Sequence, residues 1–277
     1  MRAWVNGEIV PLEDASVSVL DHGLTVGNGV FETLRVYGGE PFAWTRHFAR
    51  LCVSAEALGI EVPSSDALRA AAGAVIGAND FGEARLRITV TDGPAPPGSA
   101  RGGGPPTTIV VVFPVDPYPP TTDVVIVPWT RNERGALAGL KTISYGGNVR
   151  ALAYASARGA GEAIFANTQG NLCEATGSNV FLVRDGTVVT PPASAGCLLG
   201  VTRALVLECC AALGIPAEEL DVPIDALARA DEAFLSSTTR EAQPIAHVDG
   251  VPLTAPGPVT LRVAGAFREL VTRDIDP

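Results

Sequence analysis

The chain has 277 residues, of which 47% are hydrophobic and 18% charged, and its formal net charge at pH 7 is -10. This composition predicts a folded globule large enough for two domains, and its acidic balance excludes the basic patches of proteins that bind nucleic acid or anionic membrane surfaces. No apolar run reaches the length of a membrane span and the first residues lack a signal-peptide pattern, so we expect a cytoplasmic protein whose partners are small molecules or a second copy of itself.

Four segments have the pattern of a β-hairpin, in which a strand, a glycine-containing turn and a second strand follow one another. In chain order they are AWVNGEIVPL, LRVYGGEPFAW, FANTQGNLCEA and FLVRDGTVVTP. Asn6-Gly7 and Asp185-Gly186 are the strongest turn signals among them. Hairpins of this kind predict antiparallel sheets.

Two segments have the apolar spacing of helices. The segment TRHFARLCVSAEALGI places Phe48, Leu51, Ala55 and Leu58 on one helical face, and TRALVLECCAALGI predicts an apolar helix that ends at Gly214. Helices and hairpins in one chain predict an α+β fold.

Proline-rich stretches divide the chain. The stretch FPVDPYPPTTD is typical of an interdomain connection, so we predict a small α+β domain over 1–114, a linker over 115–123 and a larger domain over 124–277. A second Pro/Gly-rich stretch, 92–106, separates the strands ARLRITVT and TTIVVVF and is long enough to be a functional loop.

Cysteine and histidine positions give no pattern typical of metal binding. The five cysteines and three histidines lack paired ligand spacing, and the cysteines do not form a disulfide framework. We therefore predict no metal site.

Lys141 is the only lysine among the 20 basic Lys and Arg residues. An arginine guanidinium stays protonated, whereas a lysine amine can lose its proton when desolvated and attack a carbonyl group. Lys141 is therefore a candidate nucleophile, and a surface lysine is the alternative.

An anion site is indicated in the second half of the chain. Gly200, Val201 and Thr202 directly precede an apolar helix, so backbone amides, a hydroxyl and the helix dipole can meet a phosphate-sized anion there. Thr238 lies in the hydroxyl-rich segment AFLSSTTREAQP and can bind the same anion from another side. An ordinary helix cap and a polar turn are the alternatives.

Two further charged residues are candidates for cofactor contacts. Glu174 lies between a hairpin strand and a loop of small residues, where a carboxylate can keep a heteroaromatic nitrogen protonated. Arg50 lies off the apolar stripe of its helix and can reach a phosphate. The alternative for both side chains is simple solvation.

Strand alternation groups the candidate substrate contacts. Phe31 and Thr33 share one strand face in FETLR, and Arg85 and Arg87 share another in ARLRITVT. Two arginines at one site suit a substrate with two carboxylates, and a solvated edge strand is the alternative.

Taken together, these segments resemble a known family. GNGVFETLRVYGG, RHFARLCVSAEALGI, GLKTISYGGNV, LCEATGSNVFLV, LLGVTR and FLSSTTREAQPI occur in the order and close to the spacing of the class IV aminotransferases, the fold type IV enzymes that use pyridoxal 5'-phosphate (PLP). The resemblance implies an α+β fold of two α/β domains with the cofactor between them. It also implies a homodimer, because the family builds its site with a loop from the neighbouring subunit, and 92–106 is the candidate loop.

The resemblance also implies roles for individual residues. Lys141 resembles the lysine that holds PLP as a Schiff base, and Glu174 resembles the partner of the pyridine nitrogen. Tyr145 is a candidate for the PLP phenolate oxygen. The residues that resemble the phosphate ligands are Arg50, Val201, Thr202 and Thr238.

The family contains several reactions. The threonine in FETLR and the Lys-Thr pair at 141 most resemble the aminodeoxychorismate lyases, while LLGVTR resembles the branched-chain enzymes. We predict a 4-amino-4-deoxychorismate lyase of folate biosynthesis that forms 4-aminobenzoate and pyruvate, with Phe31, Thr33, Arg85 and Arg87 at the substrate. The alternatives are an aminotransferase acting on branched-chain or D-amino acids and a catalytically silent PLP-binding relative.

Overall fold

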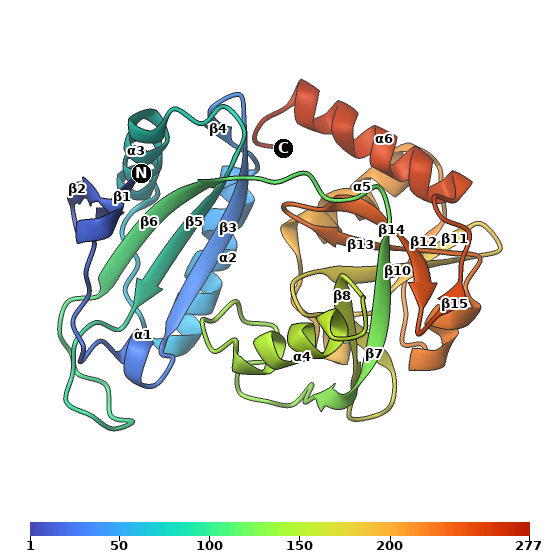
Figure 1. The fold of residues 1–277 in the computed structure, drawn as a ribbon, viewed down its shortest axis with the longest axis horizontal. Helices are drawn as coiled ribbons and strands as arrows, with labels where there is room; N and C mark the ends of the chain where they lie inside the picture. Colours follow the sequence, from blue (N-terminus) through green and yellow to red (C-terminus); the bar gives the residue numbers. More distant parts are fainter. The chain divides into compact units, whose positions relative to one another are not determined.

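The computed structural model describes all 277 residues, which divide into two compact units that each combine helices and strands (Figure 1). The first unit comprises Met1–Asp116, Leu140–Ser144 and Ile275–Pro277, and the second comprises Pro117–Gly139 and Tyr145–Asp274. The predicted α+β class is confirmed.

The units differ from the predicted domains in the linker and in two further segments. Within the predicted linker over 115–123, Asp116 ends a segment of the first unit, Pro117 starts the second unit, and a strand already begins at Thr122. Residues 140–144 and 275–277 belong to the first unit, although the sequence predicted them in a domain over 124–277. Their backbones are hydrogen-bonded in the first unit, from Phe31 N to Lys141 O and from Ala43 N to Ile275 O. Contacts between residues so far apart in the chain leave no local sequence signal.

The sheet of the first unit is antiparallel throughout, with the strand order β2-β1-β6-β5-β3-β4. The predicted Asn6-Gly7 turn joins its first two strands, and both turn residues have positive φ angles, as such a turn requires. The strands are β1 (Arg2–Val5), β2 (Glu8–Pro11), β3 (Gly29–Tyr37), β4 (Glu40–Pro41), β5 (Ala84–Thr91) and β6 (Thr107–Pro114).

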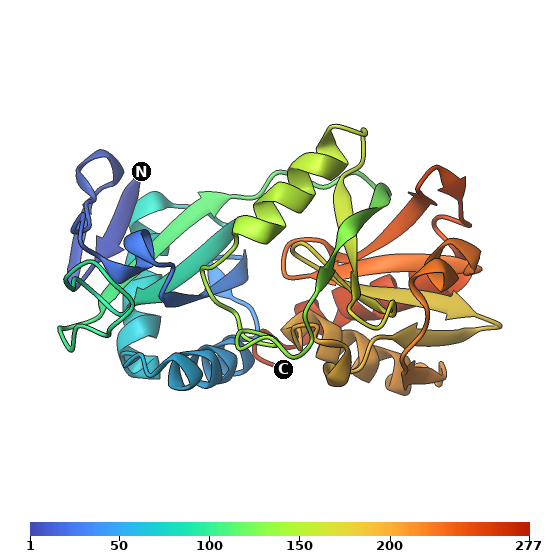
Figure 2. The ribbon, with the colours of Figure 1, turned by 90° about the horizontal axis from the view of Figure 1, so that it is seen from below.

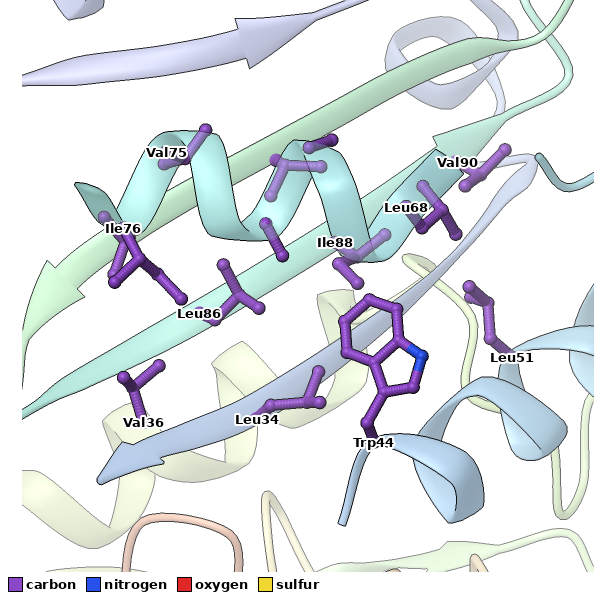
Figure 3. Packing of buried hydrophobic residues seen from close by; sticks show 14 of the residues in the cluster. Leu34, Val36, Trp44, Leu51, Leu68, Val75, Ile76, Leu86, Ile88 and Val90 are labelled. Carbon is purple, nitrogen blue, oxygen red and sulfur yellow. The ribbon is translucent and has the colours of Figure 1, made fainter. Parts of the chain in front are cut away.

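Two long helices, α2 (Trp44–Leu58) and α3 (Ser65–Asn79), cover one face of this sheet, and η1 (Leu12–Asp14) and α1 (His22–Thr25) precede them in the chain. Leu51 and Ala55 of the predicted α2 stripe are buried, and Phe48 and Leu58 are partly buried against the same core. Figure 3 shows this core, where side chains of α3 lie against alternate residues of β3 and β5. Because side chains alternate along a strand, one face of each strand packs in the core and the other face can contact a ligand.

The second unit contains a nine-stranded mixed sheet in which β7 runs parallel to both β14 and β8. The predicted Asp185-Gly186 turn and the hairpin in FANTQGNLCEA are both present. The strands are β7 (Thr122–Arg131), β8 (Glu162–Asn167), β9 (Leu172–Ala175), β10 (Asn179–Arg184), β11 (Thr187–Thr190), β12 (Ala217–Glu219), β13 (Glu232–Ser237), β14 (Glu241–Val248) and β15 (Val251–Pro252).

Three helices pack on this second sheet (Figure 2). Helix α4 (Gly146–Ser156) lies along β7 and β8, whereas α5 (Val201–Ala212) and α6 (Pro258–Arg273) pack against each other and against β13. Helix α5 ends just before Gly214, as predicted, and Gly214 has a positive φ of 64°. The short 3-10 helices are η2 (Ala193–Ala195) and η3 (Ile224–Arg229). No helix of the protein has both the length and the apolar character needed to cross a membrane.

Candidate functional site

Lys141 lies on the edge of β3 in the first unit. Its carbonyl accepts a hydrogen bond from Phe31 N at 3.1 Å, Ile143 N donates to Gly29 O at 2.9 Å, and its own amide donates to Ser54 Oγ at 3.1 Å. These bonds fix the backbone of the lysine as an additional short strand. The amine Nζ lies 4.4 Å from the centre of the Phe31 ring.

The candidate substrate contacts share one sheet face with that ring. In the register of β3 and β5, Thr33 lies opposite Arg87, and both belong to the face that points away from α2 and α3. The Arg87 guanidinium lies 3.8 Å from the Phe31 ring centre, and its Nε donates to Thr89 Oγ1 at 3.2 Å. Arg85 is exposed on the same strand face. The first unit thus brings an amine, an aromatic ring and two guanidinium groups to one surface.

Arg50, the predicted phosphate ligand, is bound to a buried carboxylate. Its Nε and Nη2 donate to the two oxygens of Glu32 at 2.8 and 2.7 Å, and His47 Nδ1 lies 2.6 Å from Glu32 Oε2. Burial alone would raise the pKa of Glu32, but the charges of Arg50 and His47 and their hydrogen bonds outweigh it and lower the pKa to about 2. Burial lowers the pKa of His47. Glu32 therefore stays charged and holds the Arg50 guanidinium in one orientation.

The sequence analysis did not identify Glu32 or His47 as site residues. A signal was present, because Glu32 alternates with the core residues Val30 and Leu34, and His47 falls on the buried side of α2. A charged residue at a core position needs a partner, and Arg50 is one helical turn from His47.

Glu174 lies in β9 of the second unit, and its side chain is 14% exposed. One carboxylate oxygen pairs with Arg131 Nε at 3.2 Å, and the other accepts a hydrogen bond from Leu198 N at 3.0 Å. The Arg131 guanidinium also lies 4.3 Å from the ring centre of Phe165, the residue opposite Glu174 in β8. Arg131 was not predicted from the sequence, since its partner is distant in the chain.

Two buried thiols flank this carboxylate. Burial, with the Glu174 charge as a smaller cause, raises the pKa of Cys197 to about 11 and also raises the pKa of Cys173. Cys173 Sγ donates to Ala195 O at 3.1 Å. The two cysteines therefore behave as small apolar packing residues beside Glu174.

The predicted anion site is the first turn of α5. Val201 and Thr202 are buried there, and the N-cap residue Gly200 gives no side-chain hydrogen bond to the turn. A Cβ atom at Gly200 would overlap Asn179 Oδ1, so any larger residue there requires the Asn179 side chain to shift. The first-turn amides consequently have no capping side chain, which suits an external anion.

The turn between β13 and β14 carries Thr238 next to this helix end. Ser236 pairs in register with Asn179, and helix α5 packs on β13. Ser236 Oγ is buried without a hydrogen-bond partner. Amides of α5, the Thr202 hydroxyl and the unpartnered Ser236 hydroxyl form a donor set that fits a phosphate, and Glu174 is tied to the same segment through Leu198. The second unit thus brings together donor groups that suit a phosphate and a carboxylate that can hold a proton on a heteroaromatic nitrogen.

Tyr145 is the N-cap residue of α4, where its carbonyl accepts a hydrogen bond from Val149 N at 2.9 Å. The side chain is half-buried in the second unit. Its contact with the cofactor phenolate oxygen stays a prediction, as does the assignment of Arg50 to the phosphate.

Comparisons with known proteins show the family of the chain. A family model described as amino-transferase class IV matches residues 29–248. The branched-chain-amino-acid aminotransferase of Escherichia coli K12 is 32% identical over 99% of this chain and 94% of its own, and its crystal structure superposes with a TM-score of 0.92 over 97% of this chain and 94% of that one.

Two further relatives carry different names. The D-alanine aminotransferase of Listeria monocytogenes is 32% identical over 99% of this chain and 97% of its own. A Legionella pneumophila structure named "Putative 4-amino-4-deoxychorismate lyase" is 25% identical, with a TM-score of 0.89 over 93% of this chain and 96% of that chain.

Proposed function

Because the chain belongs to the class IV aminotransferase family, whose enzymes work with PLP, we propose that it is a transaminase that exchanges amino groups between a branched-chain amino acid and a dicarboxylic 2-oxo acid. The observation that carries the proposal is the sheet face shared by the Lys141 amine, the Phe31 ring and the Arg87 guanidinium. An aromatic ring suits an apolar side chain, and a guanidinium suits a carboxylate. One surface can therefore accept both partners of the exchange.

Several of the predicted residues have a defined task in this proposal. PLP, when bound, supplies an electron sink for the negative charge that develops at the substrate alpha carbon. Lys141 moves the proton at that carbon, and Glu174 holds a proton on the pyridine nitrogen. The first-turn amides of α5, Thr202 and Thr238 bind the phosphate.

The lyase predicted from the sequence is the second candidate. It is supported by the Legionella structure, at 25% identity, and by Arg85 and Arg87, which suit a dicarboxylate such as aminodeoxychorismate. The two relatives at 32% identity are both aminotransferases, and they favour amino transfer. Transfer from D-amino acids is supported by the Listeria relative in the same way.

We also propose that the enzyme is a homodimer. Loop 92–106 is fixed by an ion pair between Asp92 and Arg101 at 2.8 Å, and Ala95 N donates to Leu20 O in a neighbouring segment. That neighbouring segment exposes apolar side chains, among them Val19 at 79% and Leu24 at 66%. Clustered exposed apolar residues are typical of an interface. Light scattering should give the mass of two chains, and a monomer at every concentration would contradict the dimer.

One experiment separates the reactions. The PLP-loaded protein is incubated with L-leucine, L-isoleucine, L-valine or D-alanine, each with 2-oxoglutarate or pyruvate, and separately with aminodeoxychorismate. We expect the highest kcat/KM for a branched-chain L-amino acid with 2-oxoglutarate. Rapid formation of 4-aminobenzoate without amino transfer would promote the lyase, and preference for D-alanine would reverse the stereochemical assignment.

A further inference from the structure

Glu162 is a buried carboxylate that lies outside every predicted contact. It begins β8 in the second unit and is 3% exposed. Its Oε1 accepts hydrogen bonds from Ala163 N at 3.1 Å, from Thr176 N at 3.3 Å and from the Thr176 hydroxyl, while Ser178 Oγ lies 3.5 Å from Oε2. Glu162 thereby binds residues 176–178, the loop that directly follows Glu174.

The charge partner of Glu162 comes from a different part of the unit. Arg240 Nη2 lies 3.7 Å from Glu162 Oε2, and the Arg240 side chain is 9% exposed. The guanidinium also donates to Gly161 O at 3.0 Å and to Gln243 Oε1, and it lies 4.5 Å from the ring centre of Tyr118. All of these contacts fix its position.

Arg240 belongs to the turn that carries Thr238. Its backbone amide donates to Ser237 Oγ at 3.3 Å across that turn. The loop on the other side of Glu162 leads into Asn179, which donates to Leu198 O at 2.7 Å and whose Oδ1 lies against Gly200. One buried ion pair therefore joins the loop after Glu174 to the turn of Thr238.

Burying an ion pair costs desolvation energy, and such pairs contribute little net stability compared with apolar residues of the same volume. The contribution of this buried pair is a defined geometry between the two elements that carry it.

A second buried glutamate gives a contrast. Glu232, 4% exposed, accepts hydrogen bonds from Val259 N and from the Thr260 amide and hydroxyl. Those residues start α6, which carries none of the candidate contacts.

We propose that Glu162 is a positioning residue that, through Arg240, holds the ring-nitrogen contact at Glu174 and the phosphate contact at Thr238 in one fixed geometry. PLP can then bind to both contacts without a free-energy cost for ordering either loop. The proposal rests on PLP binding, which is one part of the proposed function, and not on the identity of the substrate.

The test compares the variants E162Q and E232Q with the wild-type protein. Each replaces a buried carboxylate of the second unit by an amide of the same shape, so both are expected to lower the thermal unfolding temperature. The dissociation constant of PLP is measured by absorbance titration of the apoprotein at a temperature where all three proteins are folded. We expect at least a tenfold increase for E162Q and less than a twofold change for E232Q.

A second measurement separates positioning from general loosening. Thr238→Val is combined with E162Q, and PLP affinity is compared across the four proteins of the cycle. We expect Thr238→Val to weaken binding about tenfold in the wild-type background and less than threefold with E162Q, because the turn is already displaced there. Equal losses in both backgrounds would overturn the coupling.

Binding of PLP to E162Q within twofold of wild type would overturn the proposal. If E162Q does not fold, the double variant E162Q/R240Q, which removes both charges, replaces it with the same expectation and the same overturning result. A wild-type protein that fails to bind PLP would instead refute the proposed function. PLP binding without amino transfer would refute only the reaction and leave the test of Glu162 in force.

Discussion

Glu32 and Arg50 are joined by two parallel hydrogen bonds, of 2.8 and 2.7 Å, at the buried face of the first unit's sheet. The arrangement pairs one planar guanidinium with both oxygens of a carboxylate whose side chain is only 1% exposed. The carboxylate therefore sets the plane of the guanidinium. His47 completes the cluster through its Nδ1.

The variant E32Q is expected to be less stable than the wild-type protein, and its free energy of unfolding should depend less on pH. The pKa of Glu32 falls from 4.5 to about 2 in the folded protein, so its stabilisation is complete above pH 4.5 and is lost as the pH falls toward 2. That shift corresponds to about 3 kcal/mol at neutral pH. The lowered pKa of His47 acts in the same direction, since stability is lost as the pH falls below 6.5.

Urea unfolding of wild type and E32Q between pH 7 and pH 3 checks this prediction. The difference in free energy of unfolding between the two proteins should be largest at neutral pH and should shrink in acid. A difference that stays constant over the whole range would show that the Glu32 charge does not stabilise the fold.

Replacing Lys141 by arginine should abolish amino transfer while leaving the fold intact. Arginine keeps the positive charge beside the Phe31 ring but cannot lose a proton or bond covalently to the cofactor aldehyde. We expect kcat to fall at least about 100-fold and the yellow absorbance of the loaded protein to change. Lys141→Ala should behave alike, and full activity in either variant would remove the lysine from the mechanism.

The variant Glu174→Gln should keep PLP but slow the reaction. The amide retains an oxygen for Leu198 N and loses the charge that holds a proton on the pyridine nitrogen. We expect kcat to fall about 100-fold or more, with the PLP dissociation constant changed far less. Single-turnover kinetics monitored by cofactor absorbance measure both quantities, and an unchanged rate would reassign the role.

Substitution of Gly200 by alanine should weaken phosphate binding. The added methyl group must displace the Asn179 side chain, whose amide donates to Leu198 O just before α5. We expect the PLP dissociation constant to rise about tenfold, the size of one lost charge-assisted hydrogen bond. Gly265→Ala, in α6, is the matched control, because a Cβ there meets no atom within 4 Å.

Arg85 and Arg87 should decide acceptor choice. The variants Arg85→Gln and Arg87→Gln are expected to lower kcat/KM for 2-oxoglutarate about tenfold while changing that for pyruvate much less. Arg35→Gln is the control, because Arg35 lies on the same face but is bound to Glu83 at 2.7 Å. Parallel losses for both acceptors would mean that these arginines do not contact the second carboxylate.

Local sequence patterns predicted those parts of the fold that depend on near neighbours. The Asn6-Gly7 turn, the apolar stripe around Leu51 and the alternation that places Arg87 opposite the core residues all follow from short-range geometry. The lone lysine and the glycine before α5 were visible for the same reason. The sequence therefore predicts candidate site residues where a residue type is chemically unusual for its position.

The remaining site residues depend on contacts that no local pattern records. Arg131 pairs with Glu174 from 43 positions earlier in the chain, and Glu162 pairs with Arg240, 78 positions later. Each is an ordinary charged residue in the sequence, and only its burial with a specific partner gives it a role. The sequence also did not predict that Lys141 lies in the first unit, because that placement depends on hydrogen bonds to residues far away in the chain.

The strand pairing of residues 141–143 also bears on solubility. β3 ends its side of the sheet, apart from the short contact with β4, and an open edge exposes amides and carbonyls that can pair with another chain. The hydrogen bonds of Lys141 O and Ile143 N occupy one end of that edge, and β4 occupies the other. The segment that carries Lys141 thus also covers part of this edge, and disruption of its backbone should produce a protein that precipitates as well as one that is inactive.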